Sequence, residues 1–339
     1  MMNLPRLSRN AILKSCAYLL LSLTVPLQGA RAQDKLTEMN FAVLTFPSMT
    51  NTIVDVILAK GFDRANGIIA KPVPFGTAGA LWAAVANGEI AAHNMGPYTL
   101  PQIKSTGVPI AIYGTLMRLS SEQIITKNPA IKKFEDLKGK SLAAMVGFPE
   151  YDYLQMYARK SGIELSEQMT VVNATPALAR TQLEAGRVDA SMFWEPSATM
   201  FLRSNPDARV ILTGDEMWRS LTGTTGWQGM LFINTNFVKA NPGIVDKLLS
   251  IYQQAGRWLN ANPDEADAIV SSNKYISRDI PKGTIADAVK AQRLYFDVQP
   301  AWDPAINKRI WEAFKLGVEY KVLKTLPPDD SVISVRPAR

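Results

Sequence analysis

The chain has 339 residues, of which 47% are hydrophobic and 20% charged, with 37 lysines and arginines against 30 acidic residues. This length and composition suit a globular protein of two domains or lobes, each with a proper core. The first 32 residues hold four of the basic residues and no acid, so the rest of the chain has a net charge of only +3. That charge is too small, and the basic residues too scattered, for a nucleic-acid-binding protein.

The N-terminus is typical of a secretory signal peptide. Three basic residues precede the apolar run 17–25, and the small-x-small triplet Ala30-Arg31-Ala32 follows it. The run is shorter than the roughly 20 residues of a membrane helix. We predict a signal peptide over 1–32, cleavage after Ala32 and a periplasmic protein. Cys16, the single cysteine, precedes the apolar run, so the mature chain has no disulfide, thiol nucleophile or lipidated cysteine.

The remaining chain alternates short apolar strands with amphipathic helices, which predicts parallel sheets with helices on both faces. Strands are predicted at 40–44, 68–74, 90–92, 109–117, 122–127, 141–145, 169–172, 188–193, 209–212 and 229–233. Helices are predicted at 51–66, 80–87, 151–160, 176–185, from 196 onward, and at 242–260, 263–273, 284–295 and 304–320, with a helical turn at 134–140 and an irregular segment at 214–226.

A weak internal repeat suggests two similar lobes. Residues 81–95 and 178–193 each contain a helix, a glycine that can end it (Gly88 or Gly186), one charged residue and a strand. Any helix-glycine-strand unit has the same plan, so the repeat is compatible with lobe symmetry without requiring it. We predict a first lobe formed by 33–120 and by the α-rich return segment 226–339, and a second lobe formed by 121–225.

The search for catalytic groups is mostly negative. His93 is the single histidine and cannot build a metal cluster, and no glycine-rich phosphate loop or nucleophile elbow is present. The paired acids Glu135-Asp136 and Asp329-Asp330 lie in polar contexts typical of solvated charge. We therefore predict no catalytic residue, no metal ligand and no cofactor.

Aromatic and polar residues instead follow the predicted strands, where open α/β sheets bind small molecules. The candidate ligand-binding residues are Phe46, Ser48, Met49, Thr50, Thr77, Ala78, His93, Asn94, Phe148, Tyr151, Asp152, Trp194, Glu195 and Trp227.

Five segments carry a resemblance over nearly the whole mature chain: AVANGEIAAHNMGP, FEDLKGKSLA, ALARTQLEAGRVDASMFWEP, NTNFVKANPGIVDKLL and WLNANPDEADAIV. In this order and spacing the chain resembles periplasmic solute-binding proteins of ABC importers with the type II fold, in the nitrate/sulfonate/taurine and thiamine-precursor group. The resemblance implies a monomer of two Rossmann-like lobes, joined by two crossings and closing over one small ligand, which is delivered to an inner-membrane permease. A pyrimidine synthase in the same group uses a cysteine-rich motif, which the mature chain lacks; an enzyme or a sensor is the disfavoured alternative.

The ligand stays open between two classes. The resemblance favours a sulfonate, nitrate or taurine-like anion, which the helix start at Thr77-Ala78-Gly79 could bind through its N–H groups. Asp152 and Glu195 would repel such an anion if they face the ligand, and would suit an amine, amidine or aminopyrimidine with aromatic rings stacked on it. Alternatively, Asp152 only complements its helix dipole, and His93 either donates to a ligand oxygen or lies in the core.

Overall fold

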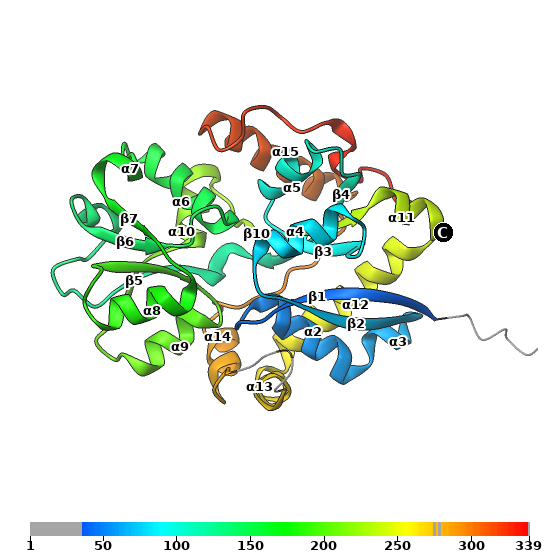
Figure 1. The fold of residues 1–339 in the computed structure, drawn as a ribbon, viewed down its shortest axis with the longest axis horizontal. Helices are drawn as coiled ribbons and strands as arrows, with labels where there is room; N and C mark the ends of the chain where they lie inside the picture. The colour runs from blue at the N-terminus through cyan, green and yellow to red at the C-terminus, as the bar shows by residue number, and fades with distance from the viewer. Residues whose placement is uncertain (1–35, 274–275, 277–278, 338–339) are drawn as a thin grey trace, which may run out of the picture. The chain divides into compact units, whose positions relative to one another are not determined.

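The computed structural model describes residues 36–273, 276 and 279–337. The predicted signal peptide and its cleavage after Ala32 lie outside these residues. Figure 1 shows the five-stranded sheet of the second lobe at the left, and two smaller sheets, which belong to the first lobe, at the right. Within the described chain, no helix is long and apolar enough to cross a membrane.

The five-stranded sheet has the order β7-β6-β8-β5-β9. Its strands are β5 (Glu122–Thr126), β6 (Ser141–Ala144), β7 (Thr170–Asn173), β8 (Ala190–Trp194) and β9 (Arg209–Thr213). β6 runs parallel to β7 and β8, whereas β5 is antiparallel to β8 and β9.

The first lobe repeats this arrangement in two pieces. Its strands are β1 (Thr37–Leu44), β2 (Ile68–Phe75), β3 (Ala92–Met95), β4 (Ile110–Arg118) and β10 (Trp227–Asn234). β1 pairs with β2 in parallel, and β10 lies antiparallel between β3 and β4. β1 packs beside β3, so the order in the first lobe is β2-β1-β3-β10-β4. This matches the second lobe: in both, the second strand along the chain lies at one edge, followed by the first, the third, the crossing strand and the fourth.

The two segments of the sequence repeat occupy equivalent places in this order. Gly88 precedes β3 and Gly186 precedes β8, each with a positive φ, 83° and 66° respectively. Both β3 and β8 are the third strand of their lobe and lie next to its crossing strand. The repeat in the sequence therefore corresponds to a repeat in topology.

The prediction of purely parallel sheets was wrong for the two crossing strands. β5 and β10 are antiparallel to both of their neighbours. β5 comes from β4 of the other lobe through the short 3-10 helix η1 (Leu119–Ser121). It therefore starts at the edge of the sheet where its neighbour ends, and its first residue, Glu122, pairs with the last residue of β8, Trp194.

Helices cover both faces of the second sheet, because its buried side chains alternate between two cores. Ile124 and Met192 pack with α6 (Pro149–Lys160), α7 (Leu165–Gln168) and α10 (Gly214–Thr222). Ile125 and Phe193 point to the other face, against α8 (Pro176–Glu184) and α9 (Ser197–Ser204).

The first lobe has the same layers. Phe41 and Leu231 pack in a core with α2 (Met49–Lys60), α3 (Phe62–Ala65), α11 (Thr235–Ala240), α12 (Ile244–Ala261), α13 (Pro263–Ser272) and α14 (Thr284–Lys290). Ala42 and Phe232, one residue along each strand, face α4 (Ala78–Ala86), α5 (Thr99–Lys104) and α15 (Pro304–Glu319). Two further 3-10 helices are η2 (Phe134–Leu137) and η3 (Asp329–Ser331).

Several element bounds differ from the prediction for local reasons. The helix predicted over 51–66 ends at Lys60, because Gly61 adopts a left-handed conformation (φ 67°) and closes α2 before the short α3. The segment predicted as irregular at 214–226 contains α10, which begins with a capping box between Thr213 and Glu216. The predicted helix 284–295 stops at Lys290.

Candidate functional site

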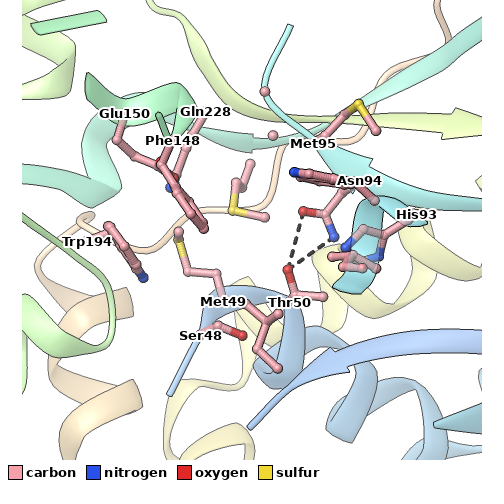
Figure 2. Close-up of a pocket in the computed structure, with 16 residues that line it drawn as sticks. Ser48, Met49, Thr50, His93, Asn94, Met95, Phe148, Glu150, Trp194 and Gln228 are labelled. Carbon is pink, nitrogen blue, oxygen red and sulfur yellow. Dashed lines mark hydrogen bonds between the residues drawn. The ribbon is translucent and has the colours of Figure 1, made fainter. Parts of the chain in front are cut away.

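A cavity of about 90 Å³ lies where the ends of strands from both lobes meet. Its walls are Leu44, Ser48, Met49, Thr50, Leu81, Trp82, His93, Asn94, Met95, Gly96, Met117, Phe148, Glu150, Trp194, Gln228 and Gly229. Figure 2 shows Ser48, Thr50, Asn94 and His93 of the first lobe facing Phe148 and Trp194 of the second. The strand-end rule for α/β sheets thus holds for both lobes at once.

The first-lobe wall is built on the start of α2. Ser48 is the N-cap, and its hydroxyl accepts a hydrogen bond from the Asn51 backbone N–H (3.1 Å). The Asn51 side chain is fully buried and binds the backbone of Leu44, Phe46 and Ile276. This network holds the loop between β1 and α2 in place, so the positive end of the α2 dipole is directed at the cavity.

Thr50 and Asn94 form a polar pair on the same wall. The Asn94 Nδ2 and the Thr50 hydroxyl lie 3.1 Å apart, and the same hydroxyl lies 3.3 Å from the Asn94 Oδ1. Thr50 comes from α2 and Asn94 from β3, so the pair joins two elements. Together with Ser48, it offers hydroxyl and amide groups for a ligand.

His93 lies deep in this wall. It is 5% exposed, and burial lowers its pKa to about 3, so its imidazole is neutral at physiological pH. Its ring packs edge-on against Phe232, with centroids 6.1 Å apart, and is tilted against Trp82 at 6.5 Å. His93 thus contributes an uncharged donor and acceptor and no positive charge.

The second-lobe wall contains two parallel aromatic rings. Phe148, the N-cap of α6, and Trp194, the last residue of β8, have centroids 6.0 Å apart and an interplanar angle of 8°. Both rings line the cavity. They offer a flat apolar surface of the kind that binds rings and cations.

Trp194 and Glu195 are neighbours in sequence but face different surroundings. Trp194 lines the cavity, whereas Glu195 is fully buried behind it. The Glu195 Oε1 accepts hydrogen bonds from Gln123 Nε2 (3.1 Å), Thr199 Oγ1 (3.0 Å) and Arg293 Nε (3.0 Å). Burial raises the pKa of Glu195, and Arg293 opposes this shift.

Glu150 and Gln228 close the cavity next to the two crossings. The Gln228 amide nitrogen donates to the Glu150 Oε1 over 2.7 Å, and its amide oxygen accepts from the hydroxyl of Ser121. Ser121 lies in the first crossing and Gln228 in the second. Burial raises the pKa of Glu150, although the bond from Gln228 lowers it.

A second, larger cavity of about 750 Å³ shares Phe148 with the first. Phe46 and Thr77 line it from the first lobe, and the N-terminal ends of α8 and α9 line it from the second. Arg180 also lines it and forms an ion pair with Glu184 (2.9 Å). Phe148 therefore stands between a small inner cavity and a wider outer one.

Residues 56–266, more than half of the chain, match the family described as NMT1/THI5 like. The chain belongs to this family. The chain is 25% identical over 198 residues to a Bacillus subtilis (strain 168) protein named as binding aliphatic sulfonates, and 22% identical over 205 residues to the taurine-binding periplasmic protein of Escherichia coli (strain K12). The matches cover 55% and 60% of this chain and 57% and 61% of the relatives, so the chain spans less than two thirds of either.

Two solved structures share the fold of this NMT1/THI5-like chain. The alkanesulfonate-binding protein SsuA of Xanthomonas axonopodis pv. citri, bound to MOPS, has a TM-score of 0.69 at 19% identity, with 88% of this chain and 99% of that chain covered. The periplasmic aliphatic sulphonate binding protein SsuA of Escherichia coli has a TM-score of 0.71 at 18% identity, with 90% and 93% covered. The two-lobed periplasmic-binding-protein fold predicted from the sequence is therefore confirmed.

The structure brings half of the predicted ligand-binding residues of this family member together in the inner cavity. These are Ser48, Met49, Thr50, His93, Asn94, Phe148 and Trp194. Phe46 and Thr77 line the outer cavity, and Ala78 begins α4 beside Thr77. They come together because each lies in the last residues of a strand or in the segment that follows it.

Four predicted residues lie outside the walls of both cavities, among the residues that the structure describes. Trp227 packs under the Arg309 guanidinium, 4.0 Å from the ring centroid, and its Nε1 donates to Asp297 (3.3 Å). Tyr151 and Asp152 lie on α6 beyond Glu150, and Glu195 lies behind Trp194. A ligand contact by any of the fourteen candidate residues, inside or outside the cavity walls, stays a prediction.

Other wall residues were not among the predicted set. Glu150 and Gln228 each stand next to a predicted ligand-binding residue, Tyr151 and Trp227 respectively. Trp82, on α4, also lines the inner cavity, next to His93. Leu44, Leu81 and Met117 lie within apolar runs, where no sequence signal separates a cavity wall from a core, and Met95 directly follows the predicted residue Asn94.

Proposed function

We propose that this chain is the periplasmic solute-binding component of an ABC importer, which captures a small molecule between its lobes and delivers it to a membrane permease. One observation carries the proposal: the inner cavity is enclosed by both lobes and combines hydrogen-bonding groups with a flat aromatic wall. Membership of the NMT1/THI5-like family supports binding rather than catalysis, and so do the two relatives, which are both named as binding proteins.

Closure of the two lobes follows from this arrangement. Thr50 and Asn94 line the cavity from the first lobe, and Phe148 and Trp194 line it from the second. A ligand contacts both sets of residues at once only when the two lobes are close together. The ligand would thus favour the closed form through its differential contacts. We propose that the lobes comprise 33–120 with 226–339, and 121–225.

Two ligand classes are candidates. The relatives named for sulfonates and taurine make a sulfonate, nitrate or taurine-like solute the first. An amine-bearing or aromatic solute is the second, because Glu150 is the one formally charged residue in the inner cavity's described walls.

A thermal-shift screen of the mature chain tests solute capture. The panel contains nitrate, alkanesulfonates, taurine, pyrimidines, polyamines and aromatic acids. A true ligand at 100 times its Kd stabilises the folded state by about 2.7 kcal/mol. Small-angle X-ray scattering should then show a smaller radius of gyration with that ligand, and mass spectrometry should recover it unchanged. Chemical conversion of the ligand, or stabilisation without closure, would contradict the proposal.

A further inference from the structure

Glu150 is the unusual residue of the inner cavity. It is 8% exposed and bears the single formal charge among the described wall residues, none of which is lysine or arginine. Its Oε1 accepts from Gln228, but its Oε2 is buried without a hydrogen-bond partner among the described residues. A buried acceptor without a donor destabilises the protein, and a donor on the ligand would remove that cost.

Gln228 donates to only one of the two carboxylate oxygens. Its Nε2 donates to the Glu150 Oε1 and its Oε1 accepts from the Ser121 hydroxyl, so the Glu150 Oε2 receives no hydrogen bond from it. The described groups whose pKa is raised by the charge of Glu150 include Glu122 on β5 and Asp152 and Tyr153 on α6, and none of these three is a cation. Arg293 is held by Glu195 and Thr199.

We propose that Glu150 is a specificity-determining residue of the solute site, which binds an N–H group of the solute while Phe148 and Trp194 contact its body. This inference rests on the proposed function. The opposite wall, with the α2 N-terminus, Ser48 and Thr50, suits a negative or hydrogen-bond-accepting end. The site thus binds a small solute with an amine at one end, such as an aminosulfonate, better than a simple anion.

Matched pairs of probes isolate the N–H group. Taurine and ethanesulfonate share a sulfonate and differ in the amine. Benzamidine and benzenesulfonate share a ring and differ in the sign of the head group. Isothermal titration of the wild-type chain at pH 7.5 should give at least tenfold tighter binding of taurine than of ethanesulfonate, and of benzamidine than of benzenesulfonate.

The variant Glu150→Gln tests the residue itself. It should lose at least tenfold in affinity for the amine-bearing probes and should reduce the difference within each pair. Glu167→Gln, at an exposed position on α7 of the same lobe, is the matched control and should bind like the wild type. Far-UV circular dichroism and the Tm of each variant show whether the fold is retained.

A pH profile on the unmodified chain gives an independent measurement. An ionised Glu150 binds an N–H cation best, and its burial-raised pKa means that affinity should rise with pH as the carboxyl loses its proton. His93, across the cavity, has a pKa of about 3 and stays neutral throughout. Asp152 has a pKa of about 7 and could produce a similar pH dependence. If Glu150 is responsible, the variant Asp152→Asn should show the same rise of affinity with pH.

The outcomes separate this inference from the proposed function. Equal binding within each pair, preference for the anions, or an unchanged Glu150→Gln variant overturns the role of Glu150 and leaves solute capture standing. If neither pair binds, the role of Glu150 is also overturned. If the whole thermal-shift panel also fails to stabilise the chain, the proposed function falls with it.

Discussion

At the scale of single residues, the carboxylates next to the crossings show how burial changes one chemical group in three ways. Glu195 is satisfied by Gln123, Thr199 and Arg293, and Glu150 is half satisfied by Gln228. Neither oxygen of Glu122 has a hydrogen-bond partner among the described residues, and the residue is fully buried. Burial, followed by the charges of Glu150 and Glu195, raises the pKa of Glu122 well above its usual range.

The substitution Glu122→Met should therefore stabilise the protein, by about 1–3 kcal/mol, because it removes a buried acid without partners and keeps its size. The gain should be small well below pH 4.5, where the carboxyl is protonated in both states. It should grow as pH rises, because only the unfolded chain then loses the proton. Urea unfolding at pH 5 and pH 8 measures this; an equal or larger gain at pH 5 would show the reasoning to be mistaken.

The substitution Arg293→Gln should destabilise the protein by about 3 kcal/mol, because it leaves the carboxylate of Glu195 buried without its cation. Removing Arg293 raises the pKa of Glu195 further, so the loss should be larger at pH 8 than at pH 5. The double variant Glu195→Gln, Arg293→Gln should recover part of the loss in a double-mutant cycle. Strictly additive effects of the two changes would contradict the coupling.

At the scale of elements, close packing at the first crossing depends on the absence of a side chain. α10 begins at Gly214 against η1. A Cβ at Gly214 would lie 2.1 Å from the backbone oxygen of Leu119 and 2.9 Å from the Glu122 Cβ. No real Cβ approaches a backbone oxygen so closely, so glycine lets α10 contact the crossing.

The pair Gly214→Ala and Gly79→Ala tests this contact with one change of side chain. Gly214→Ala should cost about 1–3 kcal/mol through overpacking. Gly79 lies in α4 with open space around a built Cβ, so Gly79→Ala should stabilise by about 0.5–1 kcal/mol. Chemical denaturation of both variants gives the comparison, and destabilisation of similar size at the two sites would refute the packing argument.

At the scale of the whole molecule, each lobe contains one strand that directly follows a crossing of the chain from the other lobe. β5 lies between β8 and β9, and β10 lies between β3 and β4. The tail also returns to the second lobe, where α14 packs against α9 and Arg203 pairs with Asp287. The proposed closure of the lobes would therefore involve η1, the segment before β10 and the α9–α14 contact.

Export is the prediction that concerns the chain as a whole. When the full chain is produced in a Gram-negative host, the periplasmic form should begin at Gln33, because Ala30-Arg31-Ala32 fits the small-x-small site. Intact mass and N-terminal sequencing of the periplasmic fraction measure this. Ala32→Asp should block processing, and recovery of the unprocessed chain from the wild type would contradict the predicted signal peptide.

Much of the architecture could be predicted from sequence because it depends on local, periodic patterns. All residues of 122–126 and 190–194 are buried, as expected of strands with two covered faces, and glycines such as Gly88 and Gly186 mark helix ends. The strand-end rule then gave seven of the inner-cavity residues, from Ser48 to Trp194. These signals lie within a few residues of one another in the chain.

The antiparallel direction of β5 and β10, and the composition of the cavity, depended on tertiary structure. The direction follows from the route of the chain between lobes, and nothing in the strands' own residues records it. Whether Glu150 or Asp152 lines the cavity depends on how α6 is rotated against β8 and β10. Trp194 and Glu195 both stand at the end of β8, so the sequence pattern does not distinguish them. Glu195 is buried because folding brings donors such as Arg293 next to its carboxylate, whereas Trp194 lines the cavity. A carboxylate is buried only where such donors are present.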